Sequence, residues 1–120
     1  MKKVVLGCFL IIMFICGCSS NSDNGLISYM NAKEKIINNG ALLVDVRSKE
    51  EYNENHINGA INIDVNDINE DSISEIIFSL NTEIILYSNN GSRSSQAKEL
   101  LKEYGYSNVY DLGAISNWNE

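Results

Sequence analysis

The chain has 120 residues and a formal net charge of −7. This length is enough for one domain and too short for two. The negative charge argues against nucleic acid as a partner, because a protein that binds nucleic acid presents positive charge to the phosphates. We therefore expect one small acidic domain that does not bind nucleic acid.

The first residues have the pattern of an export signal. A basic start precedes an apolar run, residues 4–16, that is too short to cross a bilayer. The sequence Ile15-Cys16-Gly17-Cys18 and the Ser/Asn-rich stretch after it resemble a bacterial lipoprotein signal. The resemblance implies removal of residues 1–17, a lipid such as palmitate on Cys18, and a flexible tether over residues 18–25. The alternatives are an ordinary signal peptide or a membrane anchor that is retained.

A lipid on Cys18 would hold the protein at the cell membrane or cell envelope, facing outside the cytoplasm. The other cysteines, Cys8 and Cys16, lie in the segment that would be removed. The mature protein would then have no free thiol and no disulfide. Its charge would fall from −7 to −9, because residues 1–17 contain two lysines and no acidic residue.

The first half of the domain, which we place at residues 26–120, contains two sets of helix-start signals. Ser28 is a candidate helix cap, and Gly40 is a candidate stop. Ser48 and Glu51 have the spacing of a capping box. We expect, in order, a helix over about residues 29–38, a strand over 42–46, a short helix to about residue 54, a turn over 56–60 and a short strand over 61–63.

The second half of the domain alternates in the same way. Asp71 and Ser72 are expected to cap one helix, and Gly105 is expected to end the next. We predict a brief turn at residues 67–68, a helix containing residues 73–80, a strand over 83–87, a loop over 88–93, a helix from 94 to about 104, a strand over 108–110, and a loop with a last helical turn over 113–118. Because strands alternate with helices, we expect an open, mostly parallel α/β sheet with helices on both faces.

The loop after the strand at residues 83–87 is the candidate site. A strand that turns sharply into a helix points several backbone N–H groups at one spot, where the helix N-terminus adds partial positive charge. Arg93 adds a full charge, and we assign it and Gly91 to function. Ser88 follows the strand's carboxyl end, where α/β folds place reactive side chains. We therefore predict an anion-binding loop made of Ser88, Asn89, Asn90, Gly91, Ser92 and Arg93.

Two blocks of the sequence, one in each half of the domain, resemble the single-domain rhodaneses. The first block reads Leu43-Val44-Asp45-Val46-Arg47-Ser48, then Glu51-Tyr52, His56-Ile57 and Gly59-Ala60-Ile61-Asn62-Ile63. The second reads Ile85-Leu86-Tyr87-Ser88-Asn89-Asn90-Gly91-Ser92-Arg93-Ser94, then Ala97, Leu100, Gly105-Tyr106, Asn108-Val109, Leu112-Gly113 and Trp118. Each block alone is moderately specific. Both together, in this order and at this separation, indicate the rhodanese-like fold.

This resemblance implies a small five-stranded parallel sheet flanked by helices. It also implies sulfur transfer, in which a Cys at the first loop position takes a sulfane sulfur from a donor such as thiosulfate and holds it as a persulfide. The six-residue loop has the length typical of sulfurtransferases, whereas related dual-specificity phosphatases have a longer loop. A small sulfur-containing or other oxyanion is the implied ligand. We expect no cofactor, and the sequence identifies no protein partner.

The chain departs from the family pattern at the catalytic position, where Ser88 stands in place of the Cys. A hydroxyl is far less acidic than a thiol, whose free pKa is about 8.5, so the loop cannot make it an alkoxide. A serine nucleophile also needs a general base, and the one histidine, His56, belongs to the other block. We therefore expect a rhodanese-like domain without sulfurtransferase activity that binds an anion or a partner.

Two alternatives stay open. The chain could be a thiosulfate sulfurtransferase whose nucleophilic Cys was substituted, or a serine hydrolase or phosphatase that uses Ser88. A smaller departure is Ala114, where the family commonly has a second Gly after Gly113, and this leaves the path of the last loop open.

The remaining candidate residues have structural interpretations that we favour. Asp45 is expected at a strand end, with Arg47 pairing with Glu51 to hold the corner between strand and helix. His56 is expected in a turn and not at a metal, because a lone histidine is a poor metal site. Trp118 is expected to pack against the sheet. Three tyrosines are expected in the core or half-buried: Tyr104, Tyr106 and Tyr110.

Overall fold

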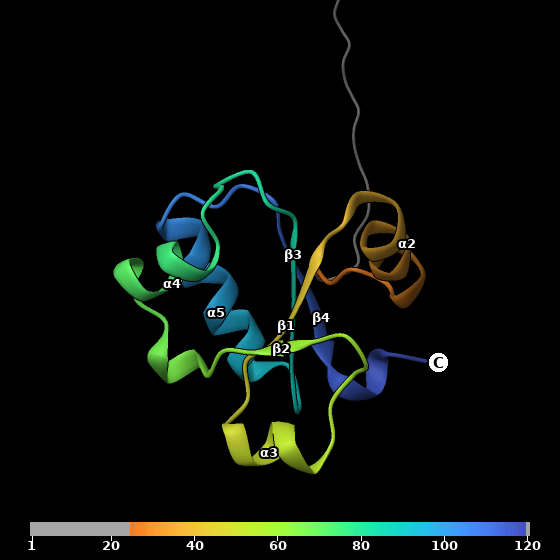
Figure 1. The fold of residues 1–120 in the computed structure, drawn as a ribbon. Helices are drawn as coiled ribbons and strands as arrows, with labels where there is room; N and C mark the ends of the chain where they lie inside the picture. Colours follow the sequence, from red (N-terminus) through yellow and green to blue (C-terminus); the bar gives the residue numbers. More distant parts are fainter. Residues whose placement is uncertain (1–24, 120) are drawn as a thin grey trace, which may run out of the picture.

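Four parallel strands form the sheet, in the order β2-β1-β3-β4 (Figure 1). The structure is a computed structural model and describes residues 25–119; the predicted signal and all of the tether before Gly25 lie outside them. The strands are β1 Leu42–Asp45, β2 Ile61–Asn62, β3 Ile84–Ser88 and β4 Val109–Ala114. The predicted open parallel α/β fold is confirmed.

Within residues 25–119 the sheet has four strands, where the family resemblance implied five. The outer edge of β4 is contacted by a single parallel bridge between Leu26 and Asp111, with the N–H of Ile27 donating to the Asp111 carbonyl at 2.8 Å. The bridge does not lengthen into a strand because Ser28 caps the next helix, and its side chain accepts the N–H of Asn31.

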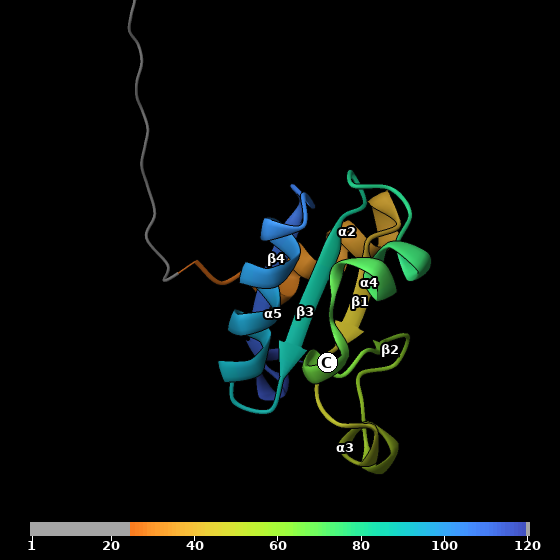
Figure 2. The same ribbon diagram turned by 90° about the vertical axis from the view of Figure 1, so that its left-hand side faces the viewer.

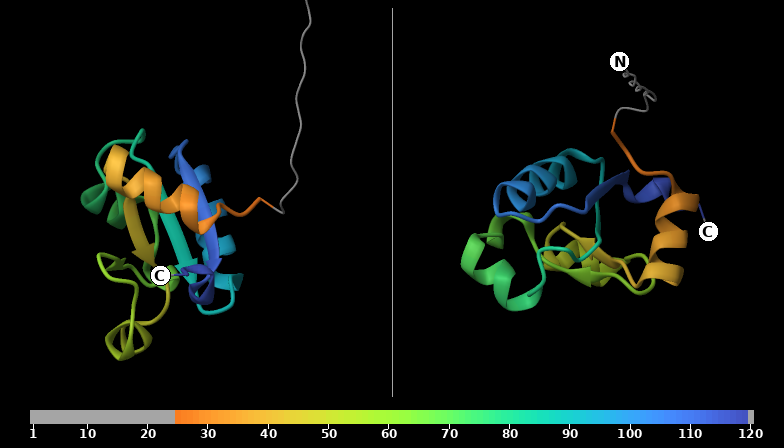
Figure 3. Two further views of the ribbon diagram at one scale, coloured as in Figure 1. Left: turned by 90° about the vertical axis from the view of Figure 1, so that its right-hand side faces the viewer. Right: turned by 90° about the horizontal axis from the view of Figure 1, so that it is seen from above.

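Helices cover both faces of the sheet, as Figures 1 and 3 show. Helix α2, Tyr29–Asn39, lies on one face, and α4, Glu70–Ile76, and α5, Ser92–Glu103, lie on the other. Helix α3, Lys49–Glu54, lies beyond the carboxyl ends of β1 and β3 (Figure 2). The described residues also form short 3-10 helices at η3, Val65–Asp67, and η4, Ile115–Asn117.

The central strand β3 divides the core in two. Ile84 and Leu86 pack into the cluster with α4 and α5, whereas Ile85 and Tyr87 pack into the cluster with α2. All four side chains are fully buried. This strand reads as a continuous apolar run because both of its faces are covered.

Local capping signals explain the helices that we predicted well. Helix α2 starts after Ser28 and ends at Gly40, and α3 starts with the expected capping box between Ser48 and Glu51. Helix α4 differs from the prediction, because Asn69 and not Asp71 is its cap. It ends at Ile76, so Leu80 lies outside the helix.

Strand β4 is longer than predicted and continues through Gly113 and Ala114, which we had assigned to a loop. A bulge accommodates them: Leu86 pairs with Asp111, but Tyr87 pairs with Gly113, so Leu112 is skipped. The predicted last helical turn follows as η4. Among residues 25–119, none of the helices has the length and apolar character needed to cross a bilayer.

Candidate functional site

The predicted loop is shorter in the structure than in the sequence pattern. Ser88 is the last residue of β3, and α5 already begins at Ser92, so Arg93 lies in the first turn of the helix. Gly91 caps α5 at a φ of 93°, a left-handed conformation that favours glycine. The loop proper is therefore Asn89 to Gly91, beside the N-terminus of α5 and on the same end of the sheet as α3 (Figure 2).

Ser88 is fully buried beneath this loop. Its Oγ accepts the backbone N–H groups of Gly91 and Ser94, both at 3.1 Å. The Ser88 hydroxyl lies 3.3 Å from the Ser94 Oγ, to which it donates, and the Ser94 hydroxyl donates to the Gly91 carbonyl at 3.2 Å. The predicted convergence of N–H groups is therefore present, and the side chain of Ser88 itself receives it.

Ser94 is a site residue that we did not predict. It is fully buried and follows Arg93 directly, at the third position of α5. Because Gly91 offers no side chain, Ser88 takes the place of an N-cap acceptor for this helix. The available sequence signal was the place of Ser94 at the start of the helix that follows Ser88. The N–H groups of a first helical turn have no partner within the helix, and here the N–H of Ser94 donates to Ser88 at the strand end.

Arg93 does not stand free at the loop. Its Nη1 and Nη2 donate to Glu51 Oε1 and Oε2 at 2.7 and 3.1 Å. Hydrogen bonding from Arg93, followed by the bond from the Ser48 backbone, lowers the pKa of Glu51 to about 2, and the same pairing raises the pKa of Arg93. The two predicted site residues are therefore brought together, as an ion pair between α3 and α5.

The polar residues at the loop tip differ in how their backbone groups are used. The N–H of Ser92 donates to the side chain of Asn90 at 3.0 Å. Within residues 25–119, the N–H groups of Asn89, Asn90 and Arg93 form no hydrogen bond. These three donors remain for a ligand.

The predicted pair between Arg47 and Glu51 is wrong. Arg47 instead binds Asp45 through Nε at 3.0 Å and Nη2 at 2.7 Å, and Nη2 also donates to the Asn55 carbonyl at 2.6 Å. Both charges are buried, and the bond to Asp45 raises the pKa of Arg47. Asp45 lies at the end of β1 as predicted, and its pair with Arg47 braces the strand end against the chain that follows α3.

The His56 side chain contacts Tyr52. Its ring stacks on Tyr52 with centroids 3.8 Å apart, and its Nδ1 lies 2.8 Å from the Tyr52 carbonyl. Tyr87, whose pKa is raised by burial, accepts the N–H of Ile57 on its hydroxyl at 3.0 Å and so anchors this turn to the sheet. Within residues 25–119, His, Cys, Asp and Glu form no group of three that could hold a metal ion.

The aromatic residues near the chain end have the expected packing. Trp118 packs against the core cluster on the α2 face and meets Tyr29 edge-to-face, with centroids 4.8 Å apart. Tyr106 is buried, and its hydroxyl donates to the Ile77 carbonyl. Tyr104 and Tyr110 are partly buried.

Gly91 and Gly113 bring the loop close to β4. A Cβ on Gly91 would lie 3.4 Å from the Cα of Gly113, and one on Gly113 would lie 3.0 Å from the Asn117 Nδ2. The Asp111 side chain accepts the N–H of Gly113 at 2.8 Å and holds the bulge in place. Ala114 follows this bulge without disturbing it.

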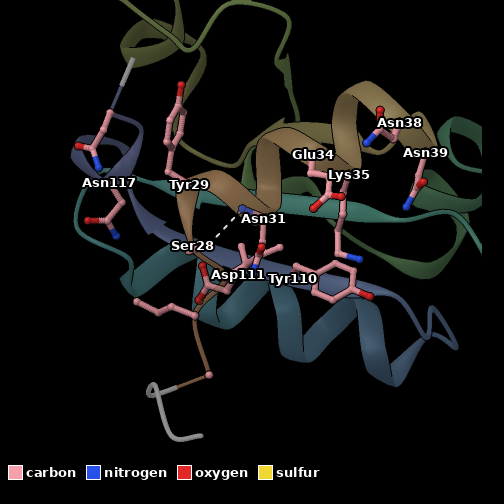
Figure 4. A pocket seen from close by; sticks show the side chains of 14 residues that line it. Ser28, Tyr29, Asn31, Glu34, Lys35, Asn38, Asn39, Tyr110, Asp111 and Asn117 are labelled. Atoms are coloured by element: carbon pink, nitrogen blue, oxygen red, sulfur yellow. Dashed lines mark hydrogen bonds between the residues drawn. The ribbon is translucent and has the colours of Figure 1, made fainter.

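An open cavity of about 980 Å³ lies elsewhere, between α2 and β4 (Figure 4). Glu34 and Lys35 of α2 face Tyr110 of β4 there. Lys35 is engaged with Glu83 at 3.4 Å and lies over the Tyr110 ring at 4.5 Å. None of the residues 88–93 lines this cavity, so the cavity and the loop are separate features of the molecule.

What the loop can do chemically follows from these contacts. The donors at its centre are directed at residue 88, so they stabilise negative charge on the side-chain atom at that position. Among residues 25–119, the groups bonded to the Ser88 hydroxyl are the N–H groups of Gly91 and Ser94 and the Ser94 hydroxyl, and none of them is a basic side chain.

Comparison with known proteins agrees with this geometry. The family described as "Rhodanese-like domain" matches residues 29–120. The chain belongs to the rhodanese-like family. The match includes both sequence blocks, residues 43–63 and 85–118, so the family pattern spans the whole described sheet.

Relatives of this rhodanese-like domain include single-domain sulfurtransferases. "Thiosulfate sulfurtransferase PspE" of Escherichia coli is 38% identical over 74 residues, which cover 62% of this chain and 70% of that protein. The structure of the human single-domain sulfurtransferase TSTD1 has a TM-score of 0.65 and 25% identity, and covers 78% of this chain and 94% of that one. A structure described as "rhodanese with anions from E. coli" has a TM-score of 0.60 and 35% identity, and covers 64% of this chain and 89% of that one.

Proposed function

We propose that this rhodanese-like domain lacks sulfurtransferase activity and binds a small oxyanion or a partner, and that it is exported as a lipid-anchored lipoprotein. One observation carries the inactivity: Ser88, at the position of the family's nucleophilic Cys, is buried and bonded to Gly91 and Ser94. Within the part of the chain that the structure describes, no basic side chain is bonded to its hydroxyl, and serine cannot form a counterpart of a persulfide. Serine-nucleophile chemistry fails for the same reason.

The binding role draws support from the donors that the loop leaves open. Asn89, Asn90 and Arg93 present N–H groups next to the N-terminus of α5, where an anion is favoured. A related structure, the rhodanese from E. coli, is described as containing anions. The pairing of Arg93 with Glu51 leaves the backbone as the main anion contact.

Activity is tested by cyanide-dependent production of thiocyanate from thiosulfate. We expect no turnover by the purified chain that starts at residue 19, measured beside the E. coli thiosulfate sulfurtransferase as a positive control. Turnover comparable to that relative would overturn the proposal. Covalent labelling of Ser88 by a fluorophosphonate would instead favour a serine hydrolase.

A thiosulfate sulfurtransferase whose Cys was substituted in this chain is the second candidate. The donors aimed at the side-chain atom of residue 88 favour it, because they would stabilise a thiolate there. Ser88→Cys should then attack the sulfane sulfur of thiosulfate, release sulfite and hold that sulfur as a persulfide. Absence of the persulfide in the variant, measured by intact mass, would show that the site has decayed beyond Ser88.

The lipid anchor is tested separately with the two neighbouring cysteines. In a bacterial host we expect labelled palmitate to be incorporated into the chain. Cys18→Ala should abolish the label, whereas Cys16→Ala, two residues away, should leave it. Absence of label from the native chain would favour an ordinary signal peptide or a retained anchor, and label that survives Cys18→Ala would place the lipid on another residue and overturn the assignment.

A further inference from the structure

The cation of the loop is already neutralised by an internal carboxylate. Arg93 and Glu51, which are 42 positions apart in the sequence, bind in a bidentate manner. Their side chains are 34% and 33% exposed, so the pair lies within reach of solvent and of a ligand. An oxyanion that approaches this guanidinium therefore meets a carboxylate that already occupies two of its donors.

The carboxylate of Glu51 is fixed in place by its own helix. Its Oε1 accepts the N–H of Ser48 at 3.1 Å and the Ser48 hydroxyl at 3.0 Å, and the Glu51 N–H donates to the Ser48 Oγ at 3.2 Å. This capping box holds the side chain at the N-terminus of α3 independently of Arg93. The negative charge is therefore a permanent part of the loop's surroundings.

A second acidic residue makes a smaller contribution. The pKa of Arg93 is raised chiefly by its hydrogen bond to Glu51 and least by the negative charge of Asp64, while burial and the charge of Arg47 lower it. Arg47, the other arginine of this region, is buried and bound to Asp45. Both arginines are therefore paired with carboxylates, and the loop offers a ligand open backbone donors.

We infer that Glu51 is a specificity-determining residue, an internal counter-ion on Arg93 that makes the loop reject multiply charged oxyanions in favour of singly charged ones. This inference rests on the proposed anion-binding role of the loop. The repulsion between a fixed carboxylate and a ligand grows with the ligand's charge, so a dianion such as thiosulfate loses more than a monoanion such as nitrate. Arg93 links α5 to α3 through Glu51 and does not serve as the positive charge that binds the ligand.

Glu51→Gln tests this with little disturbance, because glutamine also serves in a capping box. Glu50→Gln is the matched control: it removes the same charge from the same helix, at an exposed side chain that forms no hydrogen bond or ion pair within residues 25–119. Thiosulfate, sulfate and nitrate are titrated into the full chain in nonionic detergent, by calorimetry and by the NMR shifts of the Asn89, Asn90 and Arg93 amides.

We expect Glu51→Gln to bind thiosulfate at least about five-fold more tightly. This is the factor for removing the repulsion between one pair of like unit charges about 4 Å apart in water, and thiosulfate carries two such charges. The gain for nitrate should be smaller, the gain in Glu50→Gln should be less than about two-fold, and Arg93→Gln in the Glu51→Gln background should remove the gain. The unfolding midpoint of Glu51→Gln should fall. Tighter binding together with lower stability is a result that a purely structural role for Glu51 does not produce.

The outcomes separate this inference from the proposed function. If the native chain binds anions and Glu51→Gln gains nothing, or gains no more than Glu50→Gln, the inference is overturned and the binding role stands. If only Glu51→Gln binds, the inference holds and anion binding is not the native role. If neither binds, both are overturned.

Discussion

Ser94 donates its backbone N–H to the Oγ of Ser88 at 3.1 Å, while its own hydroxyl lies 3.3 Å from the same atom. With the N–H of Gly91, the first turn of α5 thus surrounds the side-chain atom at position 88 with donors. A neutral hydroxyl gains little from this arrangement, whereas an anionic atom would gain much more. The surroundings of residue 88 would therefore stabilise an anionic side-chain atom better than they stabilise the neutral serine hydroxyl that is present.

Replacing Ser88 with Cys should reveal this preference directly. We expect the introduced thiol to have a pKa below the ordinary value of about 8.5, because the N–H groups of Gly91 and Ser94 and the helix N-terminus stabilise the thiolate. The rate of alkylation by iodoacetamide against pH measures it. Ser94→Ala in the same background should raise the pKa again, because the Ser94 hydroxyl, which donates to the Gly91 carbonyl beside Ser88, can turn to donate to a thiolate and alanine cannot. A pKa at or above 8.5 in Ser88→Cys would contradict this interpretation of the loop.

Glu51 makes the stability of the fold sensitive to acid. Its pKa falls from 4.5 to about 2 in the folded chain, chiefly through Arg93, so the ionised form is favoured by folding. Its contribution is complete above pH 4.5 and is lost as the pH falls toward 2. Because the pair is one-third exposed, we expect a loss of only about 1 kcal/mol.

Urea unfolding at pH 5 and pH 3 measures that loss. Glu51→Gln should be less stable than the native chain at pH 5, and its stability should change less between the two pH values. Glu50→Gln should follow the native chain. Equal pH slopes for the native chain and Glu51→Gln would refute the assignment.

The buried pair of Asp45 and Arg47 should dominate local stability at the end of β1. Asp45→Asn leaves Arg47 buried without its counter-charge, which costs about 3 kcal/mol or more in comparable cases. The free energy of unfolding by urea checks this. Asp67→Asn, the same change at an exposed position, should cost less than about 0.5 kcal/mol. Similar losses in the two variants would mean that the pair contributes no more than a surface charge.

Gly113 should tolerate no side chain. Its φ is 88°, and an added Cβ would lie 3.0 Å from the Asn117 Nδ2 and 3.3 Å from the Leu26 Cδ1. Gly113→Ala should therefore lower the free energy of unfolding by about 2–3 kcal/mol. Gly59→Ala isolates the backbone part of this cost, because Gly59 has a φ of 92° and nothing within 4 Å of the added atom. An equal loss in both variants would show that the crowding at Gly113 has no effect.

The elements that could be predicted from the sequence are those with local signals. Ser28 and the box of Ser48 and Glu51 mark helix starts through side chains only three residues from their partners, so α2 and α3 were placed correctly. Helix α4 was misplaced because Asn69 and Asp71 are both plausible caps, and only the bond from the Ser72 N–H to Asn69 decides between them. Gly113 suggested a loop because a bulge that depends on pairing with β3 leaves no local signal.

The sequence predicted most residues of the candidate site, but it did not predict which of them form ion pairs with each other. Arg47 and Glu51 are four residues apart, so proximity in sequence suggested an ion pair between them. The fold offers each a better partner: Asp45 for the buried Arg47, and Arg93, 42 residues away, for Glu51. Ser94 was missed because its role depends on how the first turn of α5 meets the end of β3.

The single bridge between Leu26 and Asp111 has a mechanical consequence. Tension applied to the chain before Gly25 reaches the domain first at this bridge, where one backbone bond, from Ile27 to Asp111, holds the segment to the sheet. That bond can be peeled off while the four paired strands remain intact. The entry segment would then act as a weak mechanical link that extends under load before the sheet opens.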